Sequence, residues 1–83
     1  MNREDVYKLI DGERDYQERV WPMNEKPENS EHALTLIRIY TRKAEDVWND
    51  TKDQTPTMDV IRKIAGIAVR AMEAIGAPPR GGQ

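Results

Sequence analysis

The residues of this chain best suited to chemistry fall into three groups, and the first interrupts an apolar helix face. At about 100° per residue, Glu13 and Gln17 lie within about 20° of Val6, in the middle of the stripe bounded by Ile10 and Val20. Burying an unpaired carboxylate costs several kcal/mol, so Glu13 needs a partner, a proton, a ligand or an opening between subunits. Two interpretations remain open: a hydrogen bond or ion pair, for example to an arginine of another helix, and a ligand- or metal-binding role.

Arg14, Tyr16 and Trp21 surround this position. Nucleotides are often held by an aromatic side chain that stacks on the base, with an arginine nearby. We therefore include all five residues, Glu13 and Gln17 with these three, in a candidate ligand-binding set.

The second group is basic and comprises Arg62, Lys63 and Arg70, with Gly66 between the two arginines. A glycine inside a helix costs about 1 kcal/mol relative to alanine, which indicates a packing reason for it. One interpretation is close contact with another helix. The other is an anion pocket in which the three cations meet phosphates, with groups from two subunits converging.

The third group is acidic: Glu45, Asp46 and Asp50. Asp46 and Asp50 are four residues apart, a spacing at which a helix can offer oxygen ligands to Mg²⁺. Glu45 and Asp46 point away from the apolar stripe of their helix, however, and Arg42 and Lys43 are close by. This pattern favours a solvated charged face.

Composition narrows the functional classes. The chain has 83 residues, no cysteine and one histidine, His32, which argues against disulfides, cysteine-ligated zinc and histidine-based catalysis. The net charge of −2 argues against broad nucleic-acid binding. No segment has the apolar length of a membrane span or a signal peptide, so we expect a soluble intracellular protein.

Three helices are predicted to position these groups, at about residues 3–20, 31–51 and 57–75. Asn2 and Ser30 are the expected N-caps of the first two, a hydroxyl of Thr55 or Thr57 opens the third, and Gly76 ends it. Prolines in the loop 22–29 allow the chain to turn. The predicted inner faces are Val6, Leu9, Ile10, Val20 and Trp21; then Ala33, Leu36, Ile37, Tyr40, Ala44, Val47 and Trp48; then Ile61, Ile64, Ala68, Ala71, Met72 and Ile75.

The predicted fold is thus all-α, a three-helix unit over residues 1–76 with a flexible Pro/Gly tail at 77–83. A chain this short buries a small fraction of its surface, so we expect oligomerisation to complete it. Residues 1–31 carry net −4 and residues 32–83 net +2, which suits head-to-tail or crossed packing of subunits. Leu34 and Ile39 lie outside the apolar stripe of their helix. Two interpretations remain open for them: scattered surface residues, or a second contact face for a partner subunit.

The stretches ERDYQERVW (13–21), KAEDVWND (43–50) and RKIAGIAVRAMEAIGAPPR (62–80) resemble those of small phage-encoded helical proteins. Their outline is similar to the MazG-like all-α nucleoside triphosphate pyrophosphohydrolases, and the likeness covers nearly the whole chain. Those enzymes bind Mg²⁺ through E-E-x-x-E on one helix and E-x-x-D on the next. Here Asn49 replaces the last acid of the first motif, and Glu73 is the only acid between Ile61 and Ile75, so the second is missing.

Because a triphosphate-cleaving metal cluster needs several converging carboxylates, the departure favours binding without catalysis. The resemblance implies a cytoplasmic protein of an infected bacterial host, and phages encode small helical oligomers that sequester nucleotide second messengers of bacterial defence. The leading hypothesis is such a sponge, without metal or other cofactor. The alternatives are a Mg²⁺-dependent pyrophosphohydrolase using Glu13, Glu45, Asp46 and Asp50, and a structural or protein-binding module using Leu34 and Ile39.

Overall fold

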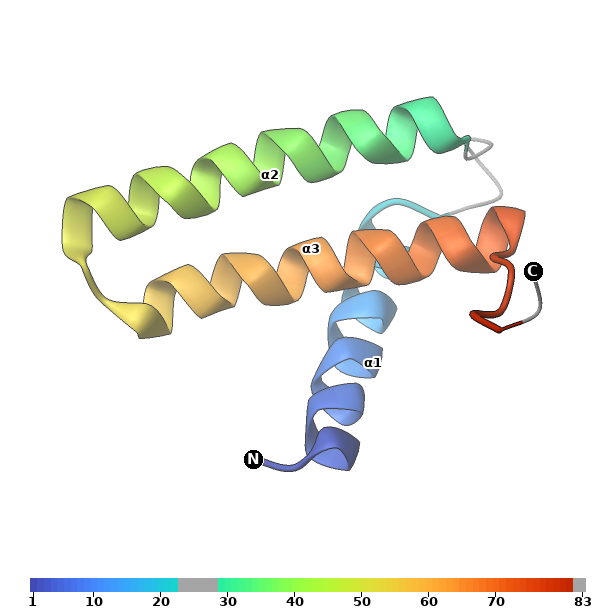
Figure 1. Cartoon of the computed structure of the whole chain (residues 1–83), viewed down its shortest axis with the longest axis horizontal. Helices are drawn as coiled ribbons and strands as arrows, with labels where there is room; N and C mark the ends of the chain where they lie inside the picture. The colour runs from blue at the N-terminus through green and yellow to red at the C-terminus, as the bar shows by residue number, and fades with distance from the viewer. Residues whose placement is uncertain (23–28, 82–83) are drawn as a thin grey trace.

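The computed structural model describes residues 1–22 and 29–81, and these form three helices and no strand. The helices are α1 (Arg3–Val20), α2 (Ser30–Thr51) and α3 (Gln54–Ile75). Figure 1 shows α2 and α3 side by side and antiparallel, with α1 running across α3. The all-α, three-helix prediction is therefore confirmed.

The first two helices begin at asparagine caps. Asn2 Oδ1 accepts a hydrogen bond from the backbone N–H of Asp5 at 2.9 Å, as predicted. At α2 the cap is Asn29 and not Ser30, because Asn29 Oδ1 accepts from the backbone N–H of His32 at 2.8 Å. Both side chains satisfy an amide that the first turn of a helix leaves without a partner.

A tight turn joins α2 to α3. Lys52 takes a left-handed conformation at φ 51°, and Asp53 then accepts a hydrogen bond from the backbone N–H of Thr55 at 3.0 Å. Because Asp53 and not a threonine is the cap, α3 begins three residues earlier than predicted, at Gln54. Gly76 ends it as expected with a φ of 88°; its ψ of 173° lies outside the left-handed helical region.

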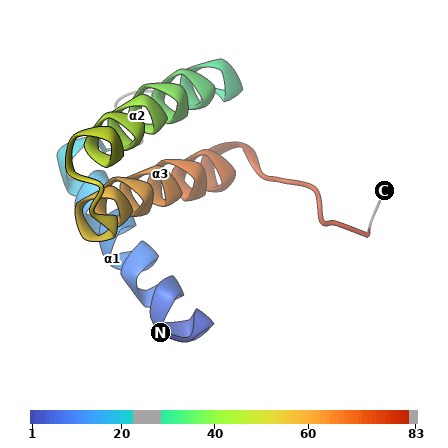
Figure 2. The same ribbon diagram turned by 60° about the vertical axis from the view of Figure 1, so that its left-hand side comes forward.

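Two connecting predictions concern residues that the structure describes only in part. The turn predicted within 22–29 falls mainly on 23–28, which lie outside the described residues, and so do residues 82–83 of the tail. Residues 77–81 lead away from the helices (Figure 2). Among the described residues, no helix combines the length and the apolar character that crossing a membrane requires.

The apolar core of the single chain is small. Among the described residues, only Ala33, Ala44, Val60 and Ile67 are buried apolar side chains, and no side chain is less than 2% exposed. The predicted inner faces of all three helices are therefore wrong in part. The stripe of α1 extends past α3, whereas the exposed part of the α3 stripe lies on another side of that helix than its buried residues Val60, Gly66 and Ile67. The exposed members are Val6, Leu9, Val20, Trp21, Trp48, Ile61, Met72 and Ile75.

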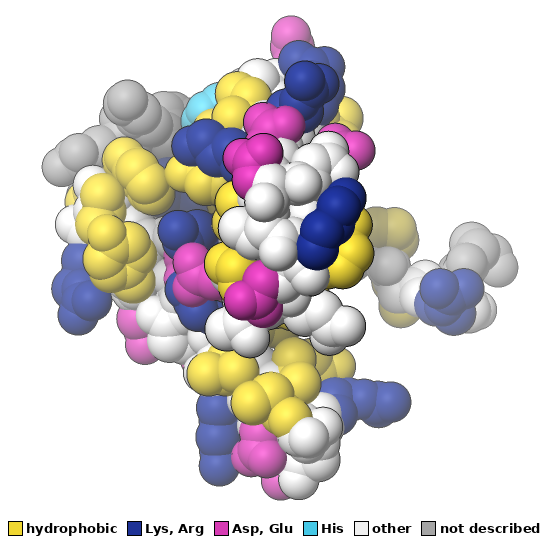
Figure 3. All heavy atoms as spheres, turned by 90° about the vertical axis from the view of Figure 1, so that its left-hand side faces the viewer, with side chains coloured by type: hydrophobic (Ala, Val, Ile, Leu, Met, Phe, Trp, Pro, Cys, Tyr) yellow, Lys and Arg dark blue, Asp and Glu magenta, His cyan; other side chains and the backbone are white. Residues whose placement is uncertain are grey.

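The N-terminal part of α1 projects below the α2–α3 pair, and hydrophobic side chains lie on its surface (Figure 3). By contrast, the buried residues of α1 are polar: Glu13, Arg14 and Gln17. The place where α1 crosses α3 thus contains the polar group that the sequence places on the apolar stripe.

Candidate functional site

Close approach of α1 to α3 depends on Gly66. A Cβ atom built on Gly66 would lie 2.7 Å from Gln17 Nε2 and 2.8 Å from Glu13 Cγ, distances that real Cβ atoms do not show. The glycine between Arg62 and Arg70 therefore serves helix–helix packing. Gly66 thus follows the packing interpretation, whereas the anion pocket predicted for the cations of this group stays a prediction.

Glu13 is paired with a cation of α3. Its Oε1 accepts a hydrogen bond from Arg62 Nε at 3.1 Å, and its Oε2 accepts one from Gln17 Nε2 at 2.8 Å. The same Gln17 nitrogen donates to the backbone oxygen of Lys63 at 3.1 Å. The Glu13 side chain is 7% exposed, so the arginine partner that the sequence analysis requires of a buried carboxylate is present.

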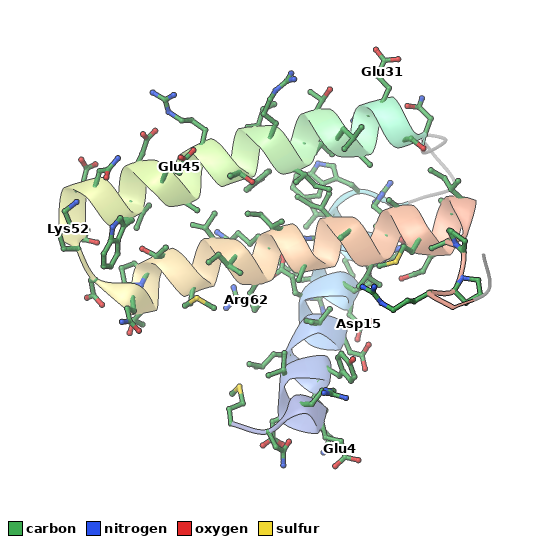
Figure 4. The ribbon with its side chains drawn as sticks, in the orientation of Figure 1. Glu4, Asp15, Glu31, Glu45, Lys52 and Arg62 are labelled. Carbon is green, nitrogen blue, oxygen red and sulfur yellow. The ribbon has the colours of Figure 1, made fainter. Side chains whose placement is uncertain are left out.

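Arg62 also binds Asp59 of its own helix, with 2.7 Å between Arg62 Nη2 and Asp59 Oδ1. The hydrogen bond with Glu13, followed by the interaction with Asp59, outweighs burial and raises the pKa of Arg62. Slight burial of Asp59 opposes its ionisation, but the charges of Arg62 and then Lys63 hold the pKa of Asp59 below its ordinary value of 3.8. Figure 4 shows Arg62 on α3 near the point where α1 crosses.

We predict that Asp59→Asn reduces the loss of stability in acid. Because the pKa of Asp59 is lowered on folding, its ion pairs stabilise the fold above pH 3.8 and lose this effect as the pH falls through the folded value. The difference in free energy of unfolding between wild type and Asp59→Asn should therefore be larger at about pH 6 than at about pH 3. Urea unfolding followed by circular dichroism measures it.

Asp15→Asn, which removes an exposed negative charge of α1, is the control for the change in net charge. An equal difference between wild type and Asp59→Asn at both pH values would contradict the prediction.

Arg14 forms a second polar contact between α1 and α3. Its Nε lies 2.8 Å from Glu73 Oε1 and its Nη2 lies 2.7 Å from Glu18 Oε1. Burial lowers the pKa of Arg14, but the hydrogen bonds with Glu18 and Glu73 outweigh that effect and the pKa is raised. Arg14 Nη1 is buried without a hydrogen-bond partner in the described structure.

A cavity of about 370 Å³ lies between the C-terminal half of α1, the first half of α2 and residues 63–70 of α3. It falls within the size range of small-molecule sites. The lining residues are Glu13, Tyr16, Gln17, Trp21, His32, Leu36, Tyr40, Lys63, Ile67 and Arg70.

Six of the eight predicted ligand-binding residues line this cavity: Glu13, Tyr16, Gln17, Trp21, Lys63 and Arg70. Arg14 and Arg62 do not, because Arg14 binds Glu18 and Glu73 and Arg62 binds Glu13 and Asp59. Arg14 and Arg62 thus lie outside the lining of this cavity, and a role for them in ligand binding stays a prediction.

Aromatic and cationic side chains meet at this cavity. Tyr16 and Trp21 are about half exposed, whereas Arg70 is buried and its Nη1 donates a hydrogen bond to the backbone oxygen of Trp21. Gln17 is 4% exposed, and its Oε1 has no hydrogen-bond partner in the described structure. The cavity thus offers aromatic surfaces, two cations and an unpaired buried acceptor in its wall.

Sequence reasoning misses four lining residues, of which three lie on α2: His32, Leu36 and Tyr40. Their spacing of four residues places them on one helix face. Leu36 and Tyr40 are predicted as core, and the cavity exists because α1 crosses α3 and leaves this face partly uncovered. The spacing alone indicates a shared face, but not a cavity in front of it.

The acidic group of α2 lies apart from the cavity. Glu45, Asp46 and Asp50 are exposed, and Asp46 Oδ1 is 3.3 Å from Arg42 Nε, as expected of a solvated charged face. Within residues 1–22 and 29–81, no three histidine, cysteine or acidic side chains converge as metal ligands would. Glu13 does not join Glu45 and Asp46, because it is paired with Arg62.

The fold and the cavity define an all-α, three-helix protein with a concave aromatic and cationic site. No protein family, curated protein or solved structure matches the chain.

Proposed function

We propose that the chain binds a nucleotide or a similar phosphorylated small molecule in this cavity and holds it without catalysis. The observation that carries the proposal is the meeting of Tyr16, Trp21 and Tyr40 with Lys63 and Arg70 around about 370 Å³. Aromatic faces stack on nucleobases, and lysine and arginine bind phosphate oxygens.

The charges support an anionic ligand. Glu13 is the one acid among the described lining residues, and it is already bound to Arg62. Lys63 Nζ also lies 3.5 Å from Asp59 Oδ2, and Arg70 donates to the backbone oxygen of Trp21, so both cations are held in place at the wall of the cavity. An anion entering the cavity meets two cations in a partly desolvated place, where their attraction is stronger than in water.

A protein that holds such a ligand tightly lowers its free concentration. The phage counter-defence proteins that the sequence resemblance suggests sequester a ligand in this way, which requires tight binding but no cleavage of a bond in the ligand. We therefore place the chain in that class as part of the proposal, with a nucleotide second messenger as the ligand.

Tyr16→Ala should weaken nucleotide binding. Base–aromatic stacking contributes about 1–3 kcal/mol, so we expect a loss of about 5- to 150-fold in affinity. The measurement is calorimetry of the whole chain against cyclic dinucleotides, ADP-ribose and nucleoside triphosphates, with the tryptophan fluorescence of a Trp48→Phe background, in which Trp21 is the remaining tryptophan, as a second readout. Tyr7→Ala is the matched control, because Tyr7 is a similarly exposed tyrosine of the same helix outside the cavity.

Lys63→Gln should weaken the binding of the same ligand and reduce the dependence of the affinity on salt concentration. Lys8→Gln, on the exposed face of α1, should change neither. No binding across the panel at high protein concentration would overturn the proposed function. Equal losses in Tyr16→Ala and Tyr7→Ala would place binding elsewhere.

Self-association is also part of the proposal. The small core of the described chain and the many large apolar side chains at its surface support it, because domains of this size are marginal alone and contiguous apolar surface is typical of interfaces. Light scattering at several concentrations tests it.

A further inference from the structure

Helix α3 has three faces, and two of them are covered. One face carries Gly66 and packs on Glu13 and Gln17 of α1. A second face, about 100–120° around the helix from Gly66, carries the buried side chains of Val60 and Ile67. Helix α2 runs along α3 as well (Figure 1).

The third face, here called the outer seam, is apolar along the length of the helix. It consists of Met58, Ile61, Ala65, Ala68, Met72 and Ile75. The four large residues are 40–55% exposed and the two alanines are half-buried. A helix that is apolar on its outer side as well as its inner side is typical of a helix buried on both sides.

The spacing of the outer seam indicates what covers it. Successive members are 3, 4, 3, 4 and 3 residues apart, the spacing at which one helix packs along another. Large side chains lie at both ends and Ala65 and Ala68 lie in the middle, so the order of sizes is the same in either direction. Such a surface is self-complementary, as a contact between two identical copies requires.

The N-terminal half of α1, residues 3–12, adds to this surface. We call it the arm. Val6 and Leu9 lie on the same side of α1 as Glu13 and Gln17, which face α3, yet both are exposed because the arm extends past α3 (Figure 1). The apolar side of the arm therefore continues beyond the crossing with nothing from the described chain over it.

We infer that the outer seam of α3 packs against the outer seam of a second copy of this chain, with the arm of each copy lying against its partner. This rests on the self-association proposed above and names its surface. The 22 residues of α3 span about 33 Å, and the arm extends this apolar surface beyond the crossing of the helices.

A second copy fits this surface better than an unrelated partner does. The single chain buries few apolar side chains, so its fold needs a partner that is always present at a matching concentration. Only another copy of the same chain meets that condition by itself.

Light scattering of the full chain and of Ile61→Glu and Met72→Glu tests the inference. We expect the wild type to be an oligomer and the two variants to fall to a lower mass or to unfold. Leu34→Glu is the matched control, because Leu34 is an exposed large residue of α2 outside the seam, and it should keep the wild-type mass. A monomeric wild type overturns both self-association and this inference, whereas an unchanged mass in both seam variants overturns only the inference.

Cross-linking decides the case in which the charged variants unfold. The chain has no cysteine, so Ala65→Cys and Ala74→Cys each present one thiol. With a short bis-maleimide, Ala65→Cys should give at least several-fold more covalent dimer than Ala74→Cys, because Ala74 is exposed and lies about 180° around α3 from Ala65. Equal yields, or no dimer from Ala65→Cys in an oligomeric protein, would overturn the inference. Neither experiment involves a nucleotide, so the result is independent of the proposed cavity ligand.

Discussion

Gly66→Ala is expected to destabilise the protein by about 1–3 kcal/mol, although alanine is the better helix former by about 1 kcal/mol. The added methyl group would lie 2.8 Å from Glu13 Cγ and 2.7 Å from Gln17 Nε2. The amide end of Gln17 can rotate away, but Cγ of Glu13 is close to the backbone of α1. Helix α1 must therefore shift, which weakens the hydrogen bonds from Arg62 to Glu13 and from Gln17 to the Lys63 backbone oxygen.

Gly12→Ala is the control with the opposite expected sign. Gly12 also lies inside a helix, and a Cβ atom added there meets nothing within 4 Å. We expect it to stabilise the protein by about 0.5–1 kcal/mol, because only the helix propensity changes. Thermal unfolding at one fixed protomer concentration measures both variants, and a stabilised Gly66→Ala would show that α1 does not pack closely on α3.

Local chemistry explains why the helices were predictable. Asn2, the proline after Trp21, and Gly76 are short-range determinants, and the structure places helix ends beside each of them. The errors at α2 and α3 came from a choice among neighbouring capping residues. Asn29 and Ser30 can both cap, as can Asp53 and the threonines after it, and the sequence does not rank them.

The junction of α1 with α3 was predictable in kind but not in detail. A helical wheel places Glu13 among apolar residues, so its carboxylate requires a partner such as an arginine. It does not choose between Arg62 and Arg70, since both flank Gly66 on one face. The crossing of the helices decides, bringing Arg62 to Glu13 and Arg70 to the carbonyl of Trp21.

Burial of the apolar stripes was less predictable, because a wheel gives the direction of a side chain and not what lies opposite it. Val6 and Leu9 point to the same side as Glu13, yet the crossing leaves them exposed. The participation of Tyr40 in the cavity has the same origin. Its neighbours across the cavity come from α1 and α3, at positions far away in the sequence.

Glu73→Ala is expected to lower the free energy of unfolding by about 1–2 kcal/mol, whereas Arg14→Met should change it by less than about 1 kcal/mol. The two side chains form one ion pair, but they differ in burial: Arg14 is 9% exposed and Glu73 is 48% exposed. Loss of Glu73 leaves a buried guanidinium with only Glu18 as its remaining acidic partner from the contacts described above. Loss of Arg14 leaves carboxylates that water can reach.

The combination Arg14→Met with Glu73→Ala separates this explanation from a simple loss of attraction. If burial of an incompletely paired charge is the cause, methionine removes that charge, and also the unpartnered Nη1, so the double variant should recover most of the stability lost in Glu73→Ala. If the ion pair stabilises the fold mainly through its attraction, Arg14→Met should lower the free energy of unfolding as much as Glu73→Ala does. The double variant should then be no more stable than either single variant. Urea unfolding of the wild type, the two single variants and the double variant, all at one protein concentration, completes this double-mutant cycle. Its coupling energy shows whether the ion pair stabilises the junction of α1 with α3 or only compensates for the burial of Arg14 there.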